Sequence, residues 1–431
     1  MSAPRSEALL RPLELFGVRL GLERVRHLLA ALGSPHLAVP AVLVAGTNGK
    51  GSTAALLAAM CRAAGYRTGL YTSPHLEAVT ERLAVDGRAI DDGVLAGHLE
   101  AIFARTDSDG PPTYFEALTV AAFRHFLTAG VEIAVLEVGL GGRLDATNVA
   151  EPVLSLITSI ARDHAEHLGA GLAAVAGEKA GILRRGAPAI AWTEDGEVEA
   201  VLRDRAREVG SELICAPQRV RMVPSAGGGG VPQRVSLRTG GDRVYDLELH
   251  LAGRHQLRNL AVAVLAAEVL AGRGWHRLDA AAIAGGARSC RWPGRLEAVD
   301  LPDGRRVILD GAHNPAAVAA VADFVRRLPE PPDLLFGAMG DKAVGEMLPA
   351  LAAVTGRVVL TRPSGRRAAD PRELRPLVAG RPVVIEPDPG RALDEALAGC
   401  EHGLLVCGSI YLVGEVRGIL RRRFGVPPPL G

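Results

Sequence analysis

The segment Val42-Leu-Val-Ala-Gly-Thr-Asn-Gly-Lys-Gly-Ser-Thr53 joins an apolar run to a glycine-rich turn and then to helix-forming residues. Ala41 to Ala45 is expected to form a buried strand, Gly46 to Gly51 a loop, and Ser52 to Ala64 a helix. In such a turn, backbone N–H groups converge on an anion, the helix N-terminus adds its dipole, and a lysine reaches the outer phosphates. The segment therefore predicts a phosphate-binding loop with Lys50 as its cation.

The spacing of this loop departs from the common phosphate-loop pattern. That pattern places four residues between its first glycine and its Gly-Lys pair. Here only two residues separate Gly46 from Gly49, and Gly51 follows Lys50. A glycine-rich strand-to-helix turn that binds no ligand is the plain alternative.

The rest of the chain alternates apolar runs with helical patterns, which indicates an α/β fold with parallel sheets covered by helices on both faces. A chain of 431 residues exceeds the roughly 250 to 300 that one core organises, so we expect two doubly wound domains. The Pro-Gly pair within Ser289 to Arg295 interrupts regular structure, and we place the boundary there, with domains at 1–294 and 295–431. Further strands are expected at 131–138, 152–160, 306–309, 334–338, 358–361 and 404–408. Helices are expected at 196–208, 255–270, 315–327 and 343–354, a loop at 227–230, and an alternating segment at 243–250.

Composition excludes several classes of protein. The chain has 49 basic and 48 acidic residues, so bulk charge does not favour nucleic acid or an anionic membrane as partner. The start, MSAPRSEALLRPLELFG, resembles no signal peptide, and no segment reaches the ~18 apolar residues of a membrane span. The five cysteines lack metal-ligand spacing. We expect a cytoplasmic monomer with reduced thiols.

Lysine is scarce in this chain. Among its 49 basic residues only Lys50, Lys179 and Lys342 are lysines. Arginine is planar and always charged, whereas the amine of lysine is a compact donor whose pKa can fall until it reacts. The three lysines are therefore candidates for work that arginine cannot do, although they can also have escaped a compositional bias by chance.

The loop GTNGKGS resembles the variant phosphate loop of the Mur ligase superfamily, and in particular of its folate-ligating branch, the folylpolyglutamate and dihydrofolate synthases. Other segments resemble that branch in the same order along nearly the whole chain. They are FGVRLGLERVRHLLAALG, YTSPHL (71–76), TYFEALT (113–119), EVGLGGRLDATN (137–148), ITSIARDH (157–164), EKAGI (178–182), WPGRLE (292–297), DGAHNP (310–315) and GSIYLVGE (408–415).

The resemblance implies an N-terminal P-loop ATPase domain of the Mur ligase kind and a smaller C-terminal Rossmann-like domain. It implies a ligase that joins glutamate to a folate-type carboxylate through an acyl phosphate, using ATP and Mg²⁺. The implied ATP contacts are Asn48, Gly49, Lys50, Gly51, Ser52, Thr53, Asn259, Arg295 and Asp310. Arg295 also suits this role physically, because a cation on a hinge meets phosphates only when the domains close; a linker ion pair is the alternative.

A metal site is expected where strands end, because ligands bind beyond the carboxyl ends of the strands in doubly wound sheets. Glu137 ends one predicted strand and His164 follows another, so both can face the phosphate loop and hold magnesium. His164 can equally be a capping or hydrogen-bonded histidine, and Arg162 replaces the leucine that the family usually has two positions before it. The resemblance adds Ser73 as a metal contact.

Lys179 can simply form an exposed ion pair of little energetic value. The resemblance implies instead that Lys179 is carbamylated and helps hold a second magnesium ion. Carbamylation needs a neutral amine, and nearby metal ions favour that form.

A pterin needs an aromatic platform and a carboxylate that accepts two hydrogen bonds. Phe115 and Asp145 supply these groups, although Phe115 can also be a core residue and Asp145 a turn residue. The resemblance places the pteroate pocket along Thr113, Tyr114, Phe115, Glu116, Leu144, Asp145 and Ala146.

We expect His313 and Ser409, at or after strand ends of the second domain, to approach the incoming glutamate, with Lys342 as a further contact for acidic substrate or phosphate. The implied catalytic residues are Lys50, Lys179, His164 and His313. The acceptor is dihydropteroate, a reduced folate or both, and we favour the bifunctional enzyme on family grounds. The alternatives are a cell-wall ligase of the Mur type and a nonenzymatic ATP-binding switch.

Overall fold

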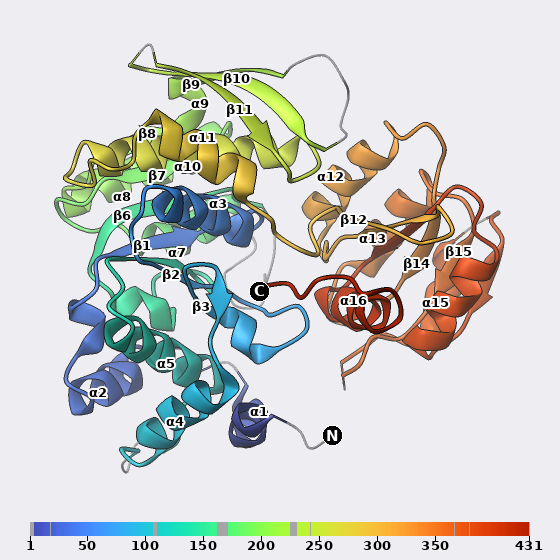
Figure 1. Cartoon of the computed structure of the whole chain (residues 1–431), viewed down its shortest axis with the longest axis horizontal. Coiled ribbons are helices and arrows are strands. Elements are labelled where there is room, and N and C mark those ends of the chain that lie inside the picture. The colour runs from blue at the N-terminus through green and yellow to red at the C-terminus, as the bar shows by residue number, and fades with distance from the viewer. Residues whose placement is uncertain are drawn as a thin grey trace.

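The computed structural model describes residues 4–17, 19–106, 110–161, 171–224, 231–241, 243–365, 367–378 and 380–430. Two lobes are joined by a single stretch of chain after α11 (Figure 1). The predicted metal ligand His164 and the predicted loop 227–230 lie outside the described residues.

An eight-stranded sheet forms the first lobe, in the order β4-β3-β2-β5-β1-β6-β7-β8. Its strands are β1 (Ala41–Ala45), β2 (Thr68–Tyr71), β3 (Leu83–Val85), β4 (Arg88–Ala89), β5 (Ile133–Glu137), β6 (Pro152–Ile157), β7 (Ala189–Ala191) and β8 (Leu213–Cys215). The six strands from β2 to β8 in this order pair in parallel, as predicted. At its edge the sheet departs from the expected parallel pattern, because the pairs β2–β3 and β3–β4 are antiparallel. Only two residues separate β3 from β4, a connection that suits an antiparallel hairpin and is too short for a parallel crossover.

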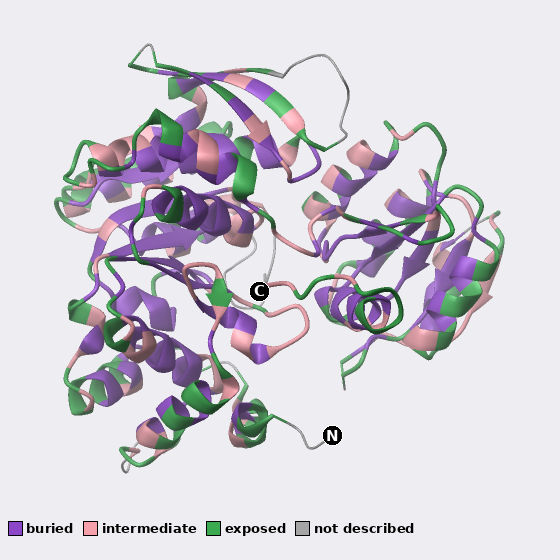
Figure 2. Ribbon diagram, in the orientation of Figure 1, coloured by how far each residue is buried: buried purple, intermediate pink, exposed green. Residues whose placement is uncertain are grey.

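The central strand β1 shows why helices cover both faces of this sheet. Its alternate side chains enter two different cores: Leu43 packs with one group of helices, and Val42 and Val44 pack with the other. In Figure 2 the strands of both large sheets are coloured mostly as buried. The first group contains α1 (Arg5–Leu10), α2 (Glu23–Ala31), α4 (Asp92–Phe103), α5 (Tyr114–Thr128), α7 (Leu172–Ala180) and α8 (Gly196–Val209). The second group contains α3 (Lys50–Ala63), α10 (His255–Ala271) and α11 (Ala280–Ser289).

A small antiparallel sheet covers the second group of helices (Figure 1). After the short helix α9 (Ala216–Arg219), its strands are β9 (Val220–Pro224), β10 (Gln233–Thr239) and β11 (Val244–Leu249). The buried residues of β11 alternate with less buried ones, as the sequence pattern at 243–250 predicts, and Leu247 and Leu249 join the core around α10.

The second lobe is built on a six-stranded sheet in the order β12-β13-β17-β14-β15-β16. Its strands are β12 (Glu297–Asp300), β13 (Arg306–Leu309), β14 (Asp333–Phe336), β15 (Val358–Leu360), β16 (Val383–Ile385) and β17 (Leu404–Cys407). All pairs are parallel except β12–β13. Helices α12 (Pro315–Val325), α13 (Val344–Ala352) and α14 (Pro371–Leu374) cover one face, and α15 (Pro389–Ala398) and α16 (Ile410–Phe424) cover the other.

Short 3₁₀ turns complete the chain at Arg11–Phe16, Pro35–Leu37, Val79–Arg82, Ala146–Val149 and Arg375–Leu377. The expected domain boundary lies between α11 and β12, and we propose 1–294 and 295–431 as the two domains.

Candidate functional site

A cavity of about 450 Å³ lies between the two domains. Its first-domain wall comes from loops that follow β1, β2, β5 and β6, from Lys179, and from the start of α10. Its second-domain wall comes from the loop after β13 and from α12. The strands thus bring their carboxyl ends to one place, as the rule for doubly wound sheets requires.

The glycine-rich loop after β1 ends in an open helix N-terminus. Helix α3 begins at Lys50, two residues earlier than expected, with Gly49 as its N-cap at φ 85°. No side chain of the described residues caps this helix, so its first amides point toward the cavity without a side-chain acceptor. A Cβ atom at position 49 would lie 2.3 Å from Asn259 Oδ1, which makes glycine necessary there.

Two residues after β6 hold the loop in place. The backbone oxygen of Asn48 accepts hydrogen bonds from Thr158 Oγ1 at 2.7 Å and from Ser159 Oγ at 2.9 Å. The amide of Asn48 donates to Ser159 Oγ at 3.1 Å. The conformation of the loop therefore depends on the segment 157–161 as well as on its own glycines.

The two lysines of the first domain both reach the glycine-rich loop. Lys50 Nζ donates to the oxygen of Thr47 at 3.2 Å, and Lys179 Nζ donates to the oxygen of Gly46 at 2.9 Å. Lys179 is buried and lines the cavity, so it does not take the exposed position that the alternative required.

Glu137 and Ser73 meet at the cavity wall. Glu137 ends β5, and its Oε2 accepts the amide of Ser73 at 3.0 Å. Burial raises the pKa of the Glu137 carboxyl above its usual range, while the positive charges of Lys50 and Arg295 act against that rise. A buried carboxylate whose pKa is raised by burial favours a cation beside it. Within the described ranges, no cluster of three or more His, Cys, Asp or Glu side chains suited to a metal is found.

The second domain contributes the loop after β13. Asp310 accepts the amides of Leu296 and Ala312, each at 2.8 Å. Burial raises the pKa of Asp310, and the charge of Arg295 opposes this. His313 lines the cavity, and its Nδ1 lies 2.9 Å from the oxygen of Gly311, so the ring donates its Nδ1 proton there.

The two domains touch directly across the cavity through a pair of amides. Asn48 Nδ2 donates to Asn314 Oδ1 at 3.2 Å, and Asn314 Nδ2 donates to Asn48 Oδ1 at 2.9 Å. This pair links the glycine-rich loop to the start of α12.

The residues expected for pteroate do not line this cavity. Thr113 and Glu116 form the capping box of α5, and Glu116 also binds Arg24 at 2.9 Å. Asp145 caps the turn Ala146–Val149 and accepts the amide of Leu140 at 2.9 Å. Phe115 packs beside Tyr71 with ring centroids 5.9 Å apart.

Phe115 and Asp145 stand directly behind the cavity wall that Gly139 to Gly141 form. A Cβ atom at Gly139 would lie 2.6 Å from the ring of Phe115, and Leu140 is tied to Asp145.

Three further predicted residues also lie outside the cavity wall. Thr53 is buried within α3, and its hydroxyl has no hydrogen-bond partner among the residues that the structure describes. Ser409 caps α16 and accepts the amide of Tyr411 at 3.2 Å. Lys342 precedes α13.

Several cavity residues were missed by the sequence analysis, namely Trp192, His255, Gln256 and Arg258. Trp192 directly follows β7, so the strand-end rule that selected Glu137 would also have selected it. Arg258 lies over its indole at 5.8 Å, and burial lowers the pKa of His255 to about 4. Gln256 bridges Ser52 at 3.3 Å and Asn259 at 2.8 Å.

Across the described part of the chain, no helix combines the length and apolar character that a membrane crossing needs.

Comparisons with known proteins agree with this geometry. The chain matches the Mur ligase middle domain over residues 44–267 and the Mur ligase, glutamate ligase domain over residues 294–410. It is 39% identical to a probable bifunctional folylpolyglutamate synthase/dihydropteroate synthase of Haloferax volcanii, covering 94% of this chain but 49% of that protein. The chain thus spans about half the length of this curated relative.

Other relatives match along their full length. The chain is 33% identical to the dihydrofolate synthase/folylpolyglutamate synthase of Bacillus subtilis, covering 94% of this chain and 96% of that one. The solved folylpolyglutamate synthase of Mycobacterium tuberculosis, complexed with ADP and AMPPCP, superposes with a TM-score of 0.88 at 31% identity, covering 97% of this chain and 100% of that chain. This chain therefore belongs to the folylpolyglutamate synthase and dihydrofolate synthase family of the Mur ligase superfamily.

Proposed function

We propose that the protein joins L-glutamate to the carboxylate of a folate-type acid, with ATP converted to ADP and phosphate. The observation that carries this proposal is the meeting of an open phosphate loop, the buried carboxylate Glu137 and a second-domain loop in one interdomain cavity. Family membership and the activities for which the relatives are named support the same reaction.

ATP fits the cavity through the open start of α3. The amides of Gly49 to Ser52 and the ammonium of Lys50 offer positive charge for the phosphates, and Asn259 and Arg295 line the same wall. Trp192 presents a buried indole N–H without a hydrogen-bond partner among the described residues, which suits an acceptor atom of the base.

Mg²⁺ fits beside Glu137 because a cation there balances the charge of the buried carboxylate. Ser73 is adjacent, since its amide donates to the same carboxylate. When bound, the metal neutralises phosphate charge and orients the phosphates. We propose Ser73, Glu137 and His164 for one ion, and Lys179, carbamylated, for a second. The support for the carbamate is that Lys179 is buried beside the phosphate loop, where its Nζ reaches the oxygen of Gly46.

The reaction starts with attack of the acceptor carboxylate oxygen on the γ-phosphorus of ATP, which yields an acyl phosphate and ADP. Lys50 and the loop amides stabilise the negative charge that develops in transfer. The amine of glutamate then attacks the acyl carbon, phosphate leaves, and an amide forms. Closure of the cavity between the domains excludes water, which would otherwise hydrolyse the acyl phosphate.

His313 is our candidate for receiving the proton that the amine loses. Its Nδ1 proton is donated to the oxygen of Gly311, so in the neutral ring Nε2 is the basic nitrogen. Asp310, Ser409 and Lys342 complete the proposed second-domain set, with Asp310 on the nucleotide and the other two near glutamate.

For the acceptor, we propose that Thr113 to Glu116 and Leu144 to Ala146 shape the pteroate pocket from behind the wall of Gly139 to Gly141. Support comes from the contact of Phe115 with Gly139 and from the hydrogen bond between Asp145 and Leu140. We favour a bifunctional enzyme that uses both dihydropteroate and reduced folate.

An ADP-release assay tests the proposal. Purified protein is mixed with ATP, Mg²⁺ and glutamate, and dihydropteroate, tetrahydrofolate and a nucleotide-sugar peptide are compared as acceptors. We expect turnover with at least one pterin acceptor. Turnover with the nucleotide-sugar peptide alone would indicate a cell-wall ligase, and nucleotide binding without any turnover would indicate a switch.

A further inference from the structure

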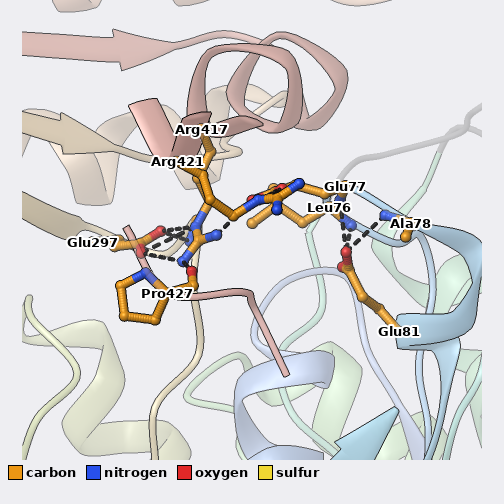
Figure 3. Close-up of polar contacts among 9 residues, drawn as sticks. Leu76, Glu77, Ala78, Glu81, Glu297, Arg417, Arg421 and Pro427 are labelled. Atoms are coloured by element: carbon orange, nitrogen blue, oxygen red, sulfur yellow. Dashed lines mark hydrogen bonds and ion pairs between the residues drawn. The ribbon is translucent and has the colours of Figure 1, made fainter. Parts of the chain in front are cut away.

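Helix α16 of the second domain carries an arginine that is almost completely buried. Arg417 is 2% exposed and lies on the face of α16 that meets the first domain (Figure 3). Its Nε donates to both carboxylate oxygens of Glu297, at 3.1 and 2.9 Å, and its Nη2 donates to Glu297 Oε1 at 2.9 Å. Its Nη1 donates to Glu77, and Nη2 also reaches the oxygen of Pro427 at 2.9 Å.

The two carboxylates bound by Arg417 belong to different parts of the molecule. Glu77 lies in the first-domain loop that begins at Ser73, whereas Glu297 opens β12 of the second domain. Arg421, one turn later on α16, donates to Glu77 from the solvent side at 2.8 Å. The guanidinium of Arg417 therefore joins the two domains at one point, with both carboxylates paired.

The loop that carries Glu77 is itself rigidly held. Glu81 accepts the three successive amides of Leu76, Glu77 and Ala78 at 2.8, 2.9 and 2.7 Å (Figure 3). Leu76 packs into the core of the second domain, although it belongs to the first. A Cβ atom at Gly414 of α16 would lie 1.8 Å from the oxygen of Leu76, so the helix and this loop are in direct backbone contact.

Arg417 is also connected, through Glu297, to the segment between the domains. Glu297, held by Arg417, accepts the amide of Gly294 at 2.9 Å. Gly294 has a φ of 70°, and its oxygen accepts the amide of Gly311 at 2.9 Å and Arg295 Nη1 at 3.1 Å. Arg295 and Gly311 both line the cavity. A chain of direct contacts thus leads from Arg417 through Glu297 and Gly294 to Arg295 and Gly311 at the cavity wall.

We propose that Arg417 is a positioning residue: by binding Glu77 and Glu297 together, it sets the distance and angle between the phosphate loop and the second-domain loop at Asp310 to His313. This inference rests on the proposed ligase function for its kinetic consequences but not for its structural one. A flexible linker alone does not fix two domains, whereas a buried, bidentate arginine pair with two carboxylates does.

The test compares Arg417→Lys and Arg417→Met with Arg423→Met in the full-length protein. Arg423 is on the same helix and pairs with Asp394 at the exposed side, so its loss controls for removing a charge from α16. Lysine keeps the charge but cannot bind two carboxylates with a planar fork. We expect Arg417→Lys to raise the KM for glutamate and lower kcat, each by about tenfold because of misplacement of the second-domain groups. Nucleotide affinity, which depends mainly on the first domain, stays unchanged.

A distance measurement separates this inference from the proposed function. All five native cysteines are buried, so spin labels at Leu127→Cys and Glu346→Cys, both at exposed positions of different domains, report the interdomain distance by pulsed electron paramagnetic resonance. We expect one narrow distribution with a nonhydrolysable ATP analogue in the parent and in Arg423→Met, and a broad one in Arg417→Lys.

Each outcome decides the inference. If the parent ligates no pterin acid, the proposed function fails, and the distance distributions alone still test the role of Arg417. An Arg417→Lys protein with parental distances and parental kinetics would overturn the inference, as would a loss of nucleotide affinity equal to the loss of kcat/KM. If Arg417→Met does not fold, the lysine variant carries the test.

Discussion

Two strand–loop–helix units face each other across the cavity. They differ in whether a side chain caps the free amides at the start of the helix. In the first domain, Gly46 to Lys50 joins β1 to α3, and the start of α3 has no side-chain cap among the described residues. In the second domain, Asp310 to Asn314 joins β13 to α12, and there Asn314 accepts the amide of Ala317 at 2.9 Å while Pro315 removes another donor.

This difference separates two ways of building a site. An open helix N-terminus offers backbone amides to an anion, whereas a capped one has already satisfied them and can offer only side chains. The first loop is therefore suited to an anion such as phosphate, whereas the second can offer side chains such as Asp310 and His313. The amide pair Asn48–Asn314 then couples the two loops.

Blocking the open start of α3 should have the largest effect on nucleotide binding and ligation. Gly49→Ala forces a side chain into a left-handed backbone and against Asn259 Oδ1, at 2.3 Å. Strain of about 1 to 3 kcal/mol plus displacement of Asn259 should weaken binding of an ATP analogue by about 100-fold or more and abolish ligation. Calorimetry measures the affinity.

Gly97→Ala is the matched control for this variant, because nothing lies within 4 Å of a Cβ atom there and the position is in the exposed part of α4. It should bind nucleotide normally and gain up to about 1 kcal/mol in stability. Normal affinity in Gly49→Ala would contradict the assignment of the first loop.

Lys179→Arg tests the proposed carbamate beneath the first loop. Arginine keeps the positive charge but cannot be carbamylated at neutral pH. Ligation should be abolished while nucleotide affinity remains close to normal, since arginine can still donate a hydrogen bond to the oxygen of Gly46 that Lys179 contacts. Mass spectrometry of the folded protein in bicarbonate, with and without Mg²⁺, provides a separate readout. Full activity in this variant would remove the carbamate proposal.

Asn314→Ala removes the side chain that caps the start of α12. Loss of the N-cap should lower the free energy of unfolding by about 1 kcal/mol. Asp388→Ala, which removes the N-cap of α15 away from the cavity, should cost a similar amount in urea denaturation. Only Asn314→Ala should also reduce kcat, because it alone breaks the contact with Asn48. Equal kinetics in the two variants would show that the amide pair does not couple the loops.

Trp192→Ala should have the smallest effect. The indole and the Arg258 guanidinium above it form one edge of the nucleotide wall. Such aromatic contacts contribute about 0.5 to 1.5 kcal/mol, so affinity for ATP should fall about fivefold and partly recover in Trp192→Phe. An unchanged affinity in the alanine variant would place the base elsewhere in the cavity.

Local sequence patterns predicted part of the site and part of the fold. The phosphate loop, Glu137 and His313 were marked by local rules, because each lies at or after the end of a short apolar strand. Asp310 was marked only by the family resemblance. The antiparallel edges formed by β3, β4 and β12 were missed because the sequence analysis expected no strands at these positions. Trp192 was missed because it follows β7, a strand that the sequence analysis did not expect.

Contacts between distant segments were beyond local rules. Thr113 and Glu116 fit a capping box by spacing, yet the pairing of Glu116 with Arg24 depends on how α2 packs on α5. Arg417 lies 340 positions from Glu77, and no periodicity or spacing connects them. The burial of this arginine follows only from domain docking.

The central claim is that an acyl phosphate forms between ATP and the acceptor acid before glutamate reacts. The direct measurement uses a folate acceptor labelled with ¹⁸O in its reactive carboxylate, with ATP, Mg²⁺ and glutamate, followed by mass analysis of the released phosphate. One ¹⁸O atom should appear in each phosphate formed. Phosphate without label, alongside normal amide formation, would contradict the account.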